Sequence, residues 1–485
     1  MSYAEQESII RCPDIQIQNA RCSHDINKEI SKEISKETPK ETTFNAELDQ
    51  GDFPEGGKGW LVIAGCICCS LISFGLVNGY GAFQTFYETQ LFPTVQSSRL
   101  SIIGGCQPTV MYFFTPLWIP LINATGLRFM LTMASCFIIT SMFGLSSIHQ
   151  GQLWKSYLFH AVMFPFGASV FFCVLMFMPM EWFKKRRATA VGIAMGGTSI
   201  GGIVWPILIK NLVPKIGFNW TVRVIGFMFI PLAIGAVVLT PQRLEDKFVS
   251  KPNTMSNSTY SRDKLKQLPT TYRLLFQGWI IQATDAQYMT MLFANLIGMF
   301  ASYPAIFYVD LFGTLLAPDT AASRYLIVIY NIFGFPGRVI PGIMGDRIGR
   351  LNTLLIVTVL CSISLLALWL PITEYKNMTA FVITAATFGF SVSPIYSLFP
   401  AAFAQVFGTR DSEARLGFYF FTSTPGPILG CLIAGSFIPL DKTSKDDQIK
   451  AYVGLVSFCG GMIVACGLVV LLVRLWINKK ILVFV

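Results

Sequence analysis

Long runs of apolar residues, separated by short polar stretches, make up most of this 485-residue chain. An apolar run of about 20 residues is long enough to cross a lipid bilayer as a helix. Runs of this kind lie near 60–82, 101–122, 129–148, 156–179, 188–209, 222–240, 288–309, 325–344, 351–371, 379–402, 416–438 and 452–476. The pattern predicts an all-α membrane protein with twelve transmembrane helices, in one six-helix half over 58–240 and a second over 288–476.

Three polar stretches flank and divide these runs. Residues 1–57 carry a four-residue repeat from Lys28 to Thr42, whose apolar content is too low to bury a core. We expect a disordered cytoplasmic tail there, either untethered or regulated by phosphorylation or ubiquitin. Residues 241–287 are rich in Lys and Arg, and we expect a cytoplasmic central loop. Residues 477–485 should form a short cytoplasmic C-terminus.

The charges indicate how the chain is oriented in the membrane. Only 13% of the residues are charged and the mean hydropathy is +0.55, whereas soluble domains have about 25% charged residues. The net charge of +10 does not indicate a nucleic-acid partner, because the Lys and Arg residues lie in loops, where they set topology. With the N-terminus inside, the basic loops at 184–187, 243–273 and 347–350 are all cytoplasmic, and the loop near 210–223 is an exception. We expect a multi-pass protein of the plasma membrane with both termini in the cytoplasm.

Arg338 lies inside the predicted span 325–344, several residues from either end. A charge in hydrocarbon costs about 2.5–3.5 kcal/mol on insertion scales, so such residues usually face a partner or a water-filled cavity. Arg338 could bind a substrate anion, or it could bond a backbone carbonyl or Asp346 and hold the following loop. About two helical turns separate Arg338 from Asp346, which disfavours their direct pairing.

The loop after this span has the pattern Gly342-x-x-x-Asp346-Arg347-x-Gly349-Arg350 between two apolar runs. It resembles the short loop between two helices in each half of major facilitator transporters, whose six-helix halves are pseudo-symmetric. The counterpart in the first half, Asn123 to Arg128, keeps a Gly and an Arg but no Asp. The resemblance implies a substrate site near the midplane between the halves. It also implies that gating depends on Gly342, Asp346, Arg347 and Arg350.

Two further segments narrow the resemblance. Pro54-Glu-Gly-Gly-Lys-Gly-Trp60 precedes the first run, and the segment from Trp182 to Gly201 joins a basic run to closely spaced Gly and Ala residues. Together they resemble the two signatures of the monocarboxylate transporter family, particularly its fungal branch, over about residues 54–476. Members are alternating-access carriers, many of which move a small carboxylate with a proton.

The resemblance assigns the family's carboxylate-binding Arg to Arg338, by spacing from the Gly-x-x-x-Asp turn. The family's proton-coupling Asp, one helical turn earlier, falls on Gly334, and its Lys in the first span falls on Asn78. Neither residue titrates. We therefore expect weak or no stoichiometric proton movement, with facilitated diffusion or exchange in its place.

Few other side chains could take over proton coupling. Asp285 and Asp310 lie at span ends, where we expect surface exposure. His160 is then the only titratable candidate left within the spans, and we expect it to be a packed neutral imidazole.

Polar side chains in other spans could line the substrate path or could instead hold neighbouring helices together. The candidate substrate-binding residues are Arg338, Asn78, Tyr80, Asn295, Tyr303, Asn331 and Tyr396, with Gln107 and Ser393 as further pore-facing candidates.

These features predict a transporter that moves a small organic acid or a related metabolite by alternating access, without the usual proton-coupling Asp. Efflux of a secondary metabolite and facilitated uptake of a riboflavin-like vitamin both stay open, because a neutral or larger substrate needs neither the Asp nor the Lys. A transporter-like sensor is a further alternative. The expected partners are a small organic anion and the lipid bilayer, and the sequence does not identify an accessory subunit.

The sequence does not predict an enzyme, a cofactor or a metal site. We find no Ser/His/Asp or metal-ligand constellation in it. The cluster of Cys66, Cys68 and Cys69 is expected to pack as small apolar side chains in the first span.

Overall fold

Helices form the regular structure in the described part of the chain, and their positions follow the apolar runs of the sequence. The computed structural model describes residues 56–183, 186–240, 257–318, 320–407, 412–438 and 444–478. The tail predicted over 1–57 and the C-terminus predicted over 477–485 lie almost entirely outside these residues.

The first half contains six helical segments, as predicted. Its helices, with π-helical stretches marked η, are α3 (Lys58–Asn78), α4 (Tyr80–Phe86), η1 (Tyr87–Leu91), α5 (Ser97–Thr125), α6 (Leu127–Leu145), α7 (Leu153–Lys155), η2 (Ser156–Met163), α8 (Phe164–Trp182) and α9 (Arg187–Leu239). The elements from α3 to η1 form one segment and those from α7 to α8 another, while α9 contains two. Helix α9 consists of two helices joined at Gly217, whose φ of 77° and ψ of 165° are not helical. Glycine accepts this positive φ without a steric penalty, so the chain bends there and returns across the bundle.

The second half repeats this plan. Its helices are α12 (Ala286–Leu316), α13 (Ala321–Arg324), α14 (Leu326–Ile348), α15 (Arg350–Ile363), η3 (Ser364–Trp369), α16 (Leu370–Tyr375), α17 (Met378–Val392), α18 (Ile395–Val406), α19 (Ser412–Ser423), α20 (Pro425–Ser436) and α21 (Lys445–Ile477). Among the described residues, 10 helices are long and apolar enough to cross a membrane. The second part of α9 and the proline-rich α5 complete the twelve, which confirms the predicted fold.

The same tight turn follows the second helix of each half. Gly126, between α5 and α6, has φ 94° and ψ 142°, and Gly349, between α14 and α15, has φ 96° and ψ 139°. Both halves therefore keep the backbone geometry of the charged loop, although only the second half carries its carboxylate, Asp346.

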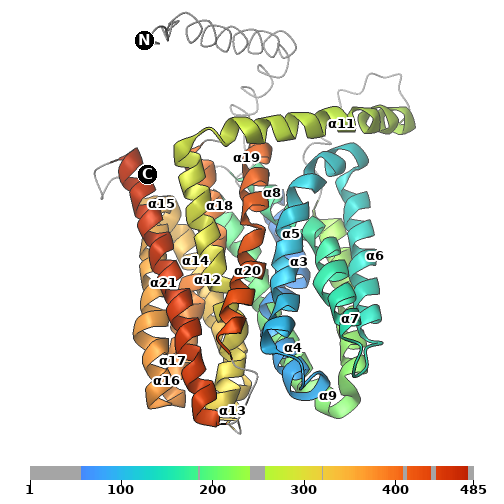
Figure 1. The fold of residues 1–485 in the computed structure, drawn as a ribbon. Helices are drawn as coiled ribbons and strands as arrows, with labels where there is room; N and C mark the ends of the chain where they lie inside the picture. Colours follow the sequence, from blue (N-terminus) through green and yellow to red (C-terminus); the bar gives the residue numbers. More distant parts are fainter. Residues whose placement is uncertain are drawn as a thin grey trace, which may run out of the picture. The chain divides into compact units, whose positions relative to one another are not determined.

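The polar stretch 241–287 contains a helix that the sequence analysis did not predict, α11 (Asn257–Gln282). Its Tyr272 hydroxyl donates to the carbonyl of Leu117 in α5 at 2.8 Å, and Trp279 stacks on Phe418 of α19 with ring centroids 5.6 Å apart. Helix α11 thus contacts one helix of each half, and it lies across one end of the bundle (Figure 1).

We name the two ends of the bundle after the carboxylates that they carry. The Asp346 end holds the turn between α14 and α15, together with α11. The Asp310 end lies opposite, where α12 ends and the short helix α13 follows (Figure 1).

Candidate functional site

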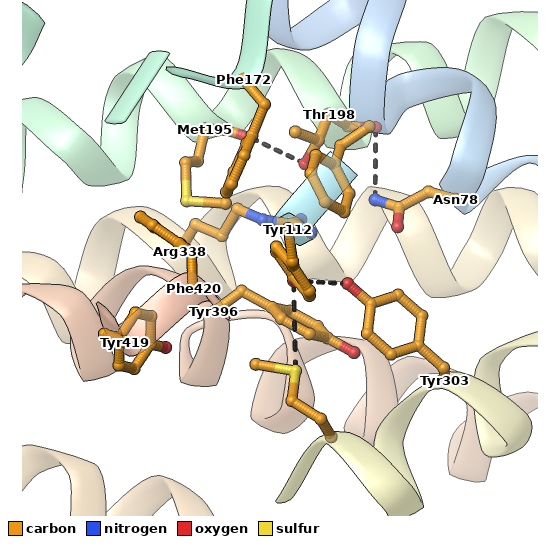
Figure 2. A pocket seen from close by; sticks show the side chains of 12 residues that line it. Asn78, Tyr112, Phe172, Met195, Thr198, Tyr303, Arg338, Tyr396, Tyr419 and Phe420 are labelled. Atoms are coloured by element: carbon orange, nitrogen blue, oxygen red, sulfur yellow. Dashed lines mark hydrogen bonds between the residues drawn. The ribbon is translucent and has the colours of Figure 1, made fainter. Parts of the chain in front are cut away.

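A small cavity lies between the two halves, about midway along their helices. Its volume is about 10 Å³, close to what a single water molecule needs. Figure 2 shows its side chains, which come from both halves. The lining residues are Phe74, Asn78, Tyr112, Phe172, Met195, Thr198, Met299, Tyr303, Arg338, Tyr396, Tyr419 and Phe420.

Arg338 is the only cation among these lining residues, and none of them is a carboxylate. Its side chain is 1% exposed. The guanidinium donates to the hydroxyl of Ser199 in α9 and, at 3.4 Å, to the carbonyl of Gly334, while its Nε has no hydrogen-bond partner among the described residues. A buried charge is costly unless it is paired. Among the described residues that line the cavity, no carboxylate neutralises this guanidinium.

Of the two positions at which the family resemblance implied charged residues, Asn78 lines the cavity and Gly334 lies beside Arg338. A Cβ atom on Gly334 would lie 2.7 Å from Ser393 Oγ and 3.3 Å from Arg338 Nη1. Ser393 and Ser199 thus occupy the space that a carboxylate would need beside the guanidinium. Asn78 lines the cavity, and its Nδ2 is 3.5 Å from the carbonyl of Thr198.

Aromatic rings make up most of the rest of the lining. The hydroxyls of Tyr112 and Tyr303 lie 2.6 Å apart and join the two halves across the cavity. Tyr112 stacks on Phe420 with centroids 5.8 Å apart, and Tyr303 packs on Tyr396 at 5.4 Å. The Tyr396 hydroxyl is buried, and no described residue forms a hydrogen bond with it. These side chains offer flat apolar faces and one unused hydroxyl close to Arg338.

Three of the predicted substrate-binding residues lie away from the cavity. Tyr80 donates to the carbonyl of Leu100 at 2.5 Å, and Asn331 donates to the carbonyls of Gly202 and Ile327 at 3.1 and 2.8 Å, so both hold helices together.

Asn295, the third, acts on the cavity through a neighbouring side chain. Its Oδ1 accepts from the hydroxyl of Tyr419, which lines the cavity, at 2.9 Å. Asn295 therefore orients Tyr419. Among the further pore-facing candidates, Gln107 is buried outside the lining, and Ser393 lies against Gly334.

The predicted gating residues come together at the Asp346 end. The Asp346 carboxylate accepts from the Thr189 amide at 3.0 Å, the Thr189 hydroxyl at 2.9 Å and the Ala188 amide at 3.4 Å. It therefore caps the N-terminus of α9 across the interface, where the helix dipole favours a negative charge. Arg350, and not Arg338, donates to the same carboxylate, at 3.1 Å.

The two other predicted gating residues have different surroundings. A Cβ atom on Gly342 would lie 3.1 Å from the Ala188 carbonyl, so glycine permits the close approach of α14 to α9. Arg347 is exposed to solvent.

Asp310 is not exposed, contrary to the expectation from sequence. Its side chain is completely buried, and its two oxygens accept from Lys210 Nζ at 2.6 and 2.8 Å. The Thr85 hydroxyl donates to the same carboxylate at 3.1 Å. Lys210 also donates to the Arg324 carbonyl at 2.7 Å, and Arg324 Nη2 donates to the Lys210 carbonyl at 2.8 Å. The expectation was wrong because the predicted run ended at 309, whereas α12 continues to Leu316.

His160 is not the only titratable side chain within the spanning helices. The first predicted run ended at 82, but its helix continues through α4 and η1 to Leu91. This extension buries Glu88 to 5% exposure, and Gln84 Nε2 donates to Glu88 Oε1 at 3.0 Å.

His160 itself is buried outside the cavity lining. Its Nδ1 is 3.1 Å from the Tyr87 hydroxyl, and the ring of Phe83 packs against it with centroids 4.6 Å apart. These surroundings suit a packed neutral imidazole.

Comparison with known proteins relates this architecture to transporters. Residues 63–431 match the Major Facilitator Superfamily. The chain is 26% identical over 458 residues to the riboflavin transporter MCH5 of Saccharomyces cerevisiae, which covers 91% of this chain and 81% of that protein. It is 25% identical over 424 residues to the agnestins efflux protein AgnL12 of Paecilomyces divaricatus, which covers 87% of this chain and 89% of that protein.

The fold itself matches solved transporters. A bacterial homologue of the human drug peptide transporters PepT1 and PepT2 superposes with a TM-score of 0.61 at 12% identity, covering 87% of this chain and 100% of that one. The chain therefore belongs to the Major Facilitator Superfamily and is a multi-pass membrane transporter rather than an enzyme.

Proposed function

We propose that this protein is a monocarboxylate-transporter-like carrier that moves a planar organic anion by alternating access. The observation that carries the proposal is Arg338, an unneutralised guanidinium buried among aromatic rings. A planar guanidinium binds a carboxylate through two parallel hydrogen bonds. The Arg338 Nε and the Tyr396 hydroxyl, for which the described part of the chain offers no hydrogen-bond partner, are the groups that such an anion would satisfy first.

The aromatic lining favours a flat ring system over a short aliphatic acid. Tyr112, Phe172, Tyr303 and Phe420 can stack on the faces of a substrate ring, and stacked or edge-on aromatic pairs contribute about 0.5–1.5 kcal/mol beyond their buried area. A two- or three-carbon acid would leave most of these faces without contact. Met195 and Met299 add side chains that adapt to different ring shapes.

The small cavity and the closed ends fit an occluded stage of the transport cycle. The halves contact each other at the Asp346 end through Thr189 and at the Asp310 end through Lys210. A cavity of about 10 Å³ cannot hold a ring, so substrate must enter when one end opens and the aromatic side chains separate. Following the positive-inside rule, we assign the Asp346 end to the cytoplasm and the protein to the plasma membrane.

The relatives include one named as a riboflavin transporter and another named for efflux of agnestins. Both names are compatible with a lining that accepts ring systems. A riboflavin-like vitamin and a secondary metabolite are therefore alternative substrates for the same cavity.

Substrate competition in proteoliposomes tests the proposal. The full-length protein is given a fused-ring aromatic carboxylate, the neutral amide of the same ring, and a three-carbon monocarboxylate. We expect the aromatic acid to be transported best, the amide more weakly and the short acid least. Preference for the short acid would overturn the proposal, and equal transport of acid and amide would favour the vitamin alternative over an anion.

A further inference from the structure

We infer that the ion pair between Lys210 and Asp310 is a second gate, which holds the halves together at the end opposite to Asp346. The pair joins α9 of the first half to α12 of the second half. The reasons are its burial, its position across the interface and its relation to the other contacts of α9.

Burial makes this pair costly to break. Asp310 is completely buried, whereas the Lys210 side chain is 14% exposed. Thr85 donates to the carboxylate from the same half as Lys210, so both described donors to this carboxylate come from across the interface. Removing one partner of a buried pair leaves an uncompensated charge, which is strongly unfavourable. The Asp310 end can therefore open only when water replaces Lys210 and Thr85 around this carboxylate.

Arg324 strengthens the same junction from the second half. Its guanidinium donates to the Lys210 carbonyl at 2.8 Å and to Asn211 Oδ1 at 3.3 Å, and its own carbonyl accepts from Lys210 Nζ. These bonds reach the first part of α9 close to its bend at Gly217, in addition to the ion pair. The contact is therefore a small network and not a single surface salt bridge, which would contribute little.

Helix α9 contacts the second half at three levels. Thr189 binds Asp346, Ser199 binds Arg338, and Lys210 binds Asp310. At 1.5 Å per residue, each of these positions on α9 is about 15–17 Å from the next. A tilt of this one helix that opens one end moves the other end in the opposite direction. The Asp310 gate, the contact with Arg338 and the contact with Asp346 therefore share one helix.

The second half connects the cavity to the new gate through α12. Tyr303 lines the cavity, and Asp310 lies seven residues, or about two turns, further along the same helix face. Between them, Phe307 packs edge-on against Tyr80 with centroids 5.1 Å apart. If the proposed function holds, a substrate that displaces the Tyr303 ring acts on the Asp310 gate through this helix.

Distances between spin labels, measured by electron paramagnetic resonance without substrate, test the gate. Labels at Lys215→Cys and Ala321→Cys, two exposed positions at the Asp310 end, report the separation of the halves. The background lacks Cys12 and Cys22, together with the three described cysteines that are not buried, Cys68, Cys106 and Cys136.

In the full-length protein in nanodiscs, we expect Asp310→Asn and Lys210→Met each to raise the ratio of open to closed populations at this end about tenfold or more. The exchange Lys210→Asp with Asp310→Lys should return the ratio towards that of the unmodified protein. Thr85→Val keeps both charges and should raise the ratio of open to closed populations by a smaller factor. This variant still tests the gate if a charge variant does not fold.

Asp446→Asn is the matched control. It breaks an ion pair with Lys376 at 2.5 Å that lies within the second half, with both side chains exposed, so the ratio should not change. Distance distributions for Asp310→Asn and Thr85→Val that match this control would overturn the gate. Because no substrate is present, this outcome is distinguishable from a failure of the proposed anion site.

Discussion

Replacing Asp346 by Asn should weaken the closed Asp346 end while leaving the cavity intact. The carboxylate accepts three hydrogen bonds from Ala188 and Thr189 at the start of α9, between 2.9 and 3.4 Å. Asn keeps one acceptor oxygen but has no charge. The loss includes about 0.3–1 kcal/mol of interaction with the helix dipole. It also includes part of a charge-assisted hydrogen bond of about 1.5–3 kcal/mol.

Together these losses amount to about 2 kcal/mol, which corresponds to about a 30-fold shift towards the state open at the Asp346 end. Asp346 lies about 12 Å along α14 from Arg338, too far to touch a substrate held there. Turnover in proteoliposomes should therefore fall, while the equilibrium affinity for substrate, measured in a matched conformation, should change little. The same substitution at Asp446, outside the interface between halves, should leave both unchanged. A large loss of affinity at unchanged turnover would refute this reasoning and place Asp346 in the substrate site.

Two further predictions concern the groups around Arg338 and energy coupling. Gly334→Asp should place a carboxylate beside the guanidinium and lower affinity for an anionic substrate about tenfold or more, because the new side chain competes for Arg338 and crowds Ser393. Affinity is measured by ligand titration with Gly334→Ala as the control, and equal affinities of the two variants would contradict this prediction. An imposed pH gradient at constant substrate ionisation should drive little or no uphill accumulation in proteoliposomes, because no carboxylate is among the residues lining the cavity in the described structure; gradient-driven accumulation would contradict it, and its loss in His160→Ala or Glu88→Gln would identify the proton carrier.

The sequence was sufficient for the twelve helices and for Arg338, because an apolar run of membrane length rarely forms anything except a spanning helix, and a charge inside such a run stands out. It was insufficient for Glu88 and Asp310. Hydropathy drops where a charged residue appears, so the predicted runs ended before these residues although the helices continue past them. Lys210 was assigned to a loop for the same reason, and its partner, 100 residues away, could not be read from a local pattern.

The cavity lining was predicted only in part. Asn78, Tyr303 and Tyr396 were chosen as polar groups in apolar spans, and they do line the cavity. Tyr80 and Asn331 gave the same signal but bond to backbone carbonyls, since a polar group in a span can equally be satisfied by a neighbouring helix. Tyr112, Phe172, Tyr419 and Phe420 were missed because aromatic residues occur throughout the chain, and only the packed helices show which of them meet.

The central claim is that Arg338 binds an anionic group of the substrate, and transport by Arg338→Lys tests it most directly. Lys keeps the charge but cannot form the paired hydrogen bonds of a guanidinium. Cell-surface protein is quantified for each variant, and uptake of the best aromatic acid is expressed per molecule at the surface. We expect Arg338→Lys to reach the surface normally and to lose most transport, about tenfold or more, with Arg338→Ala at least as impaired. Normal transport of the acid by a well-expressed Arg338→Ala protein would contradict the account.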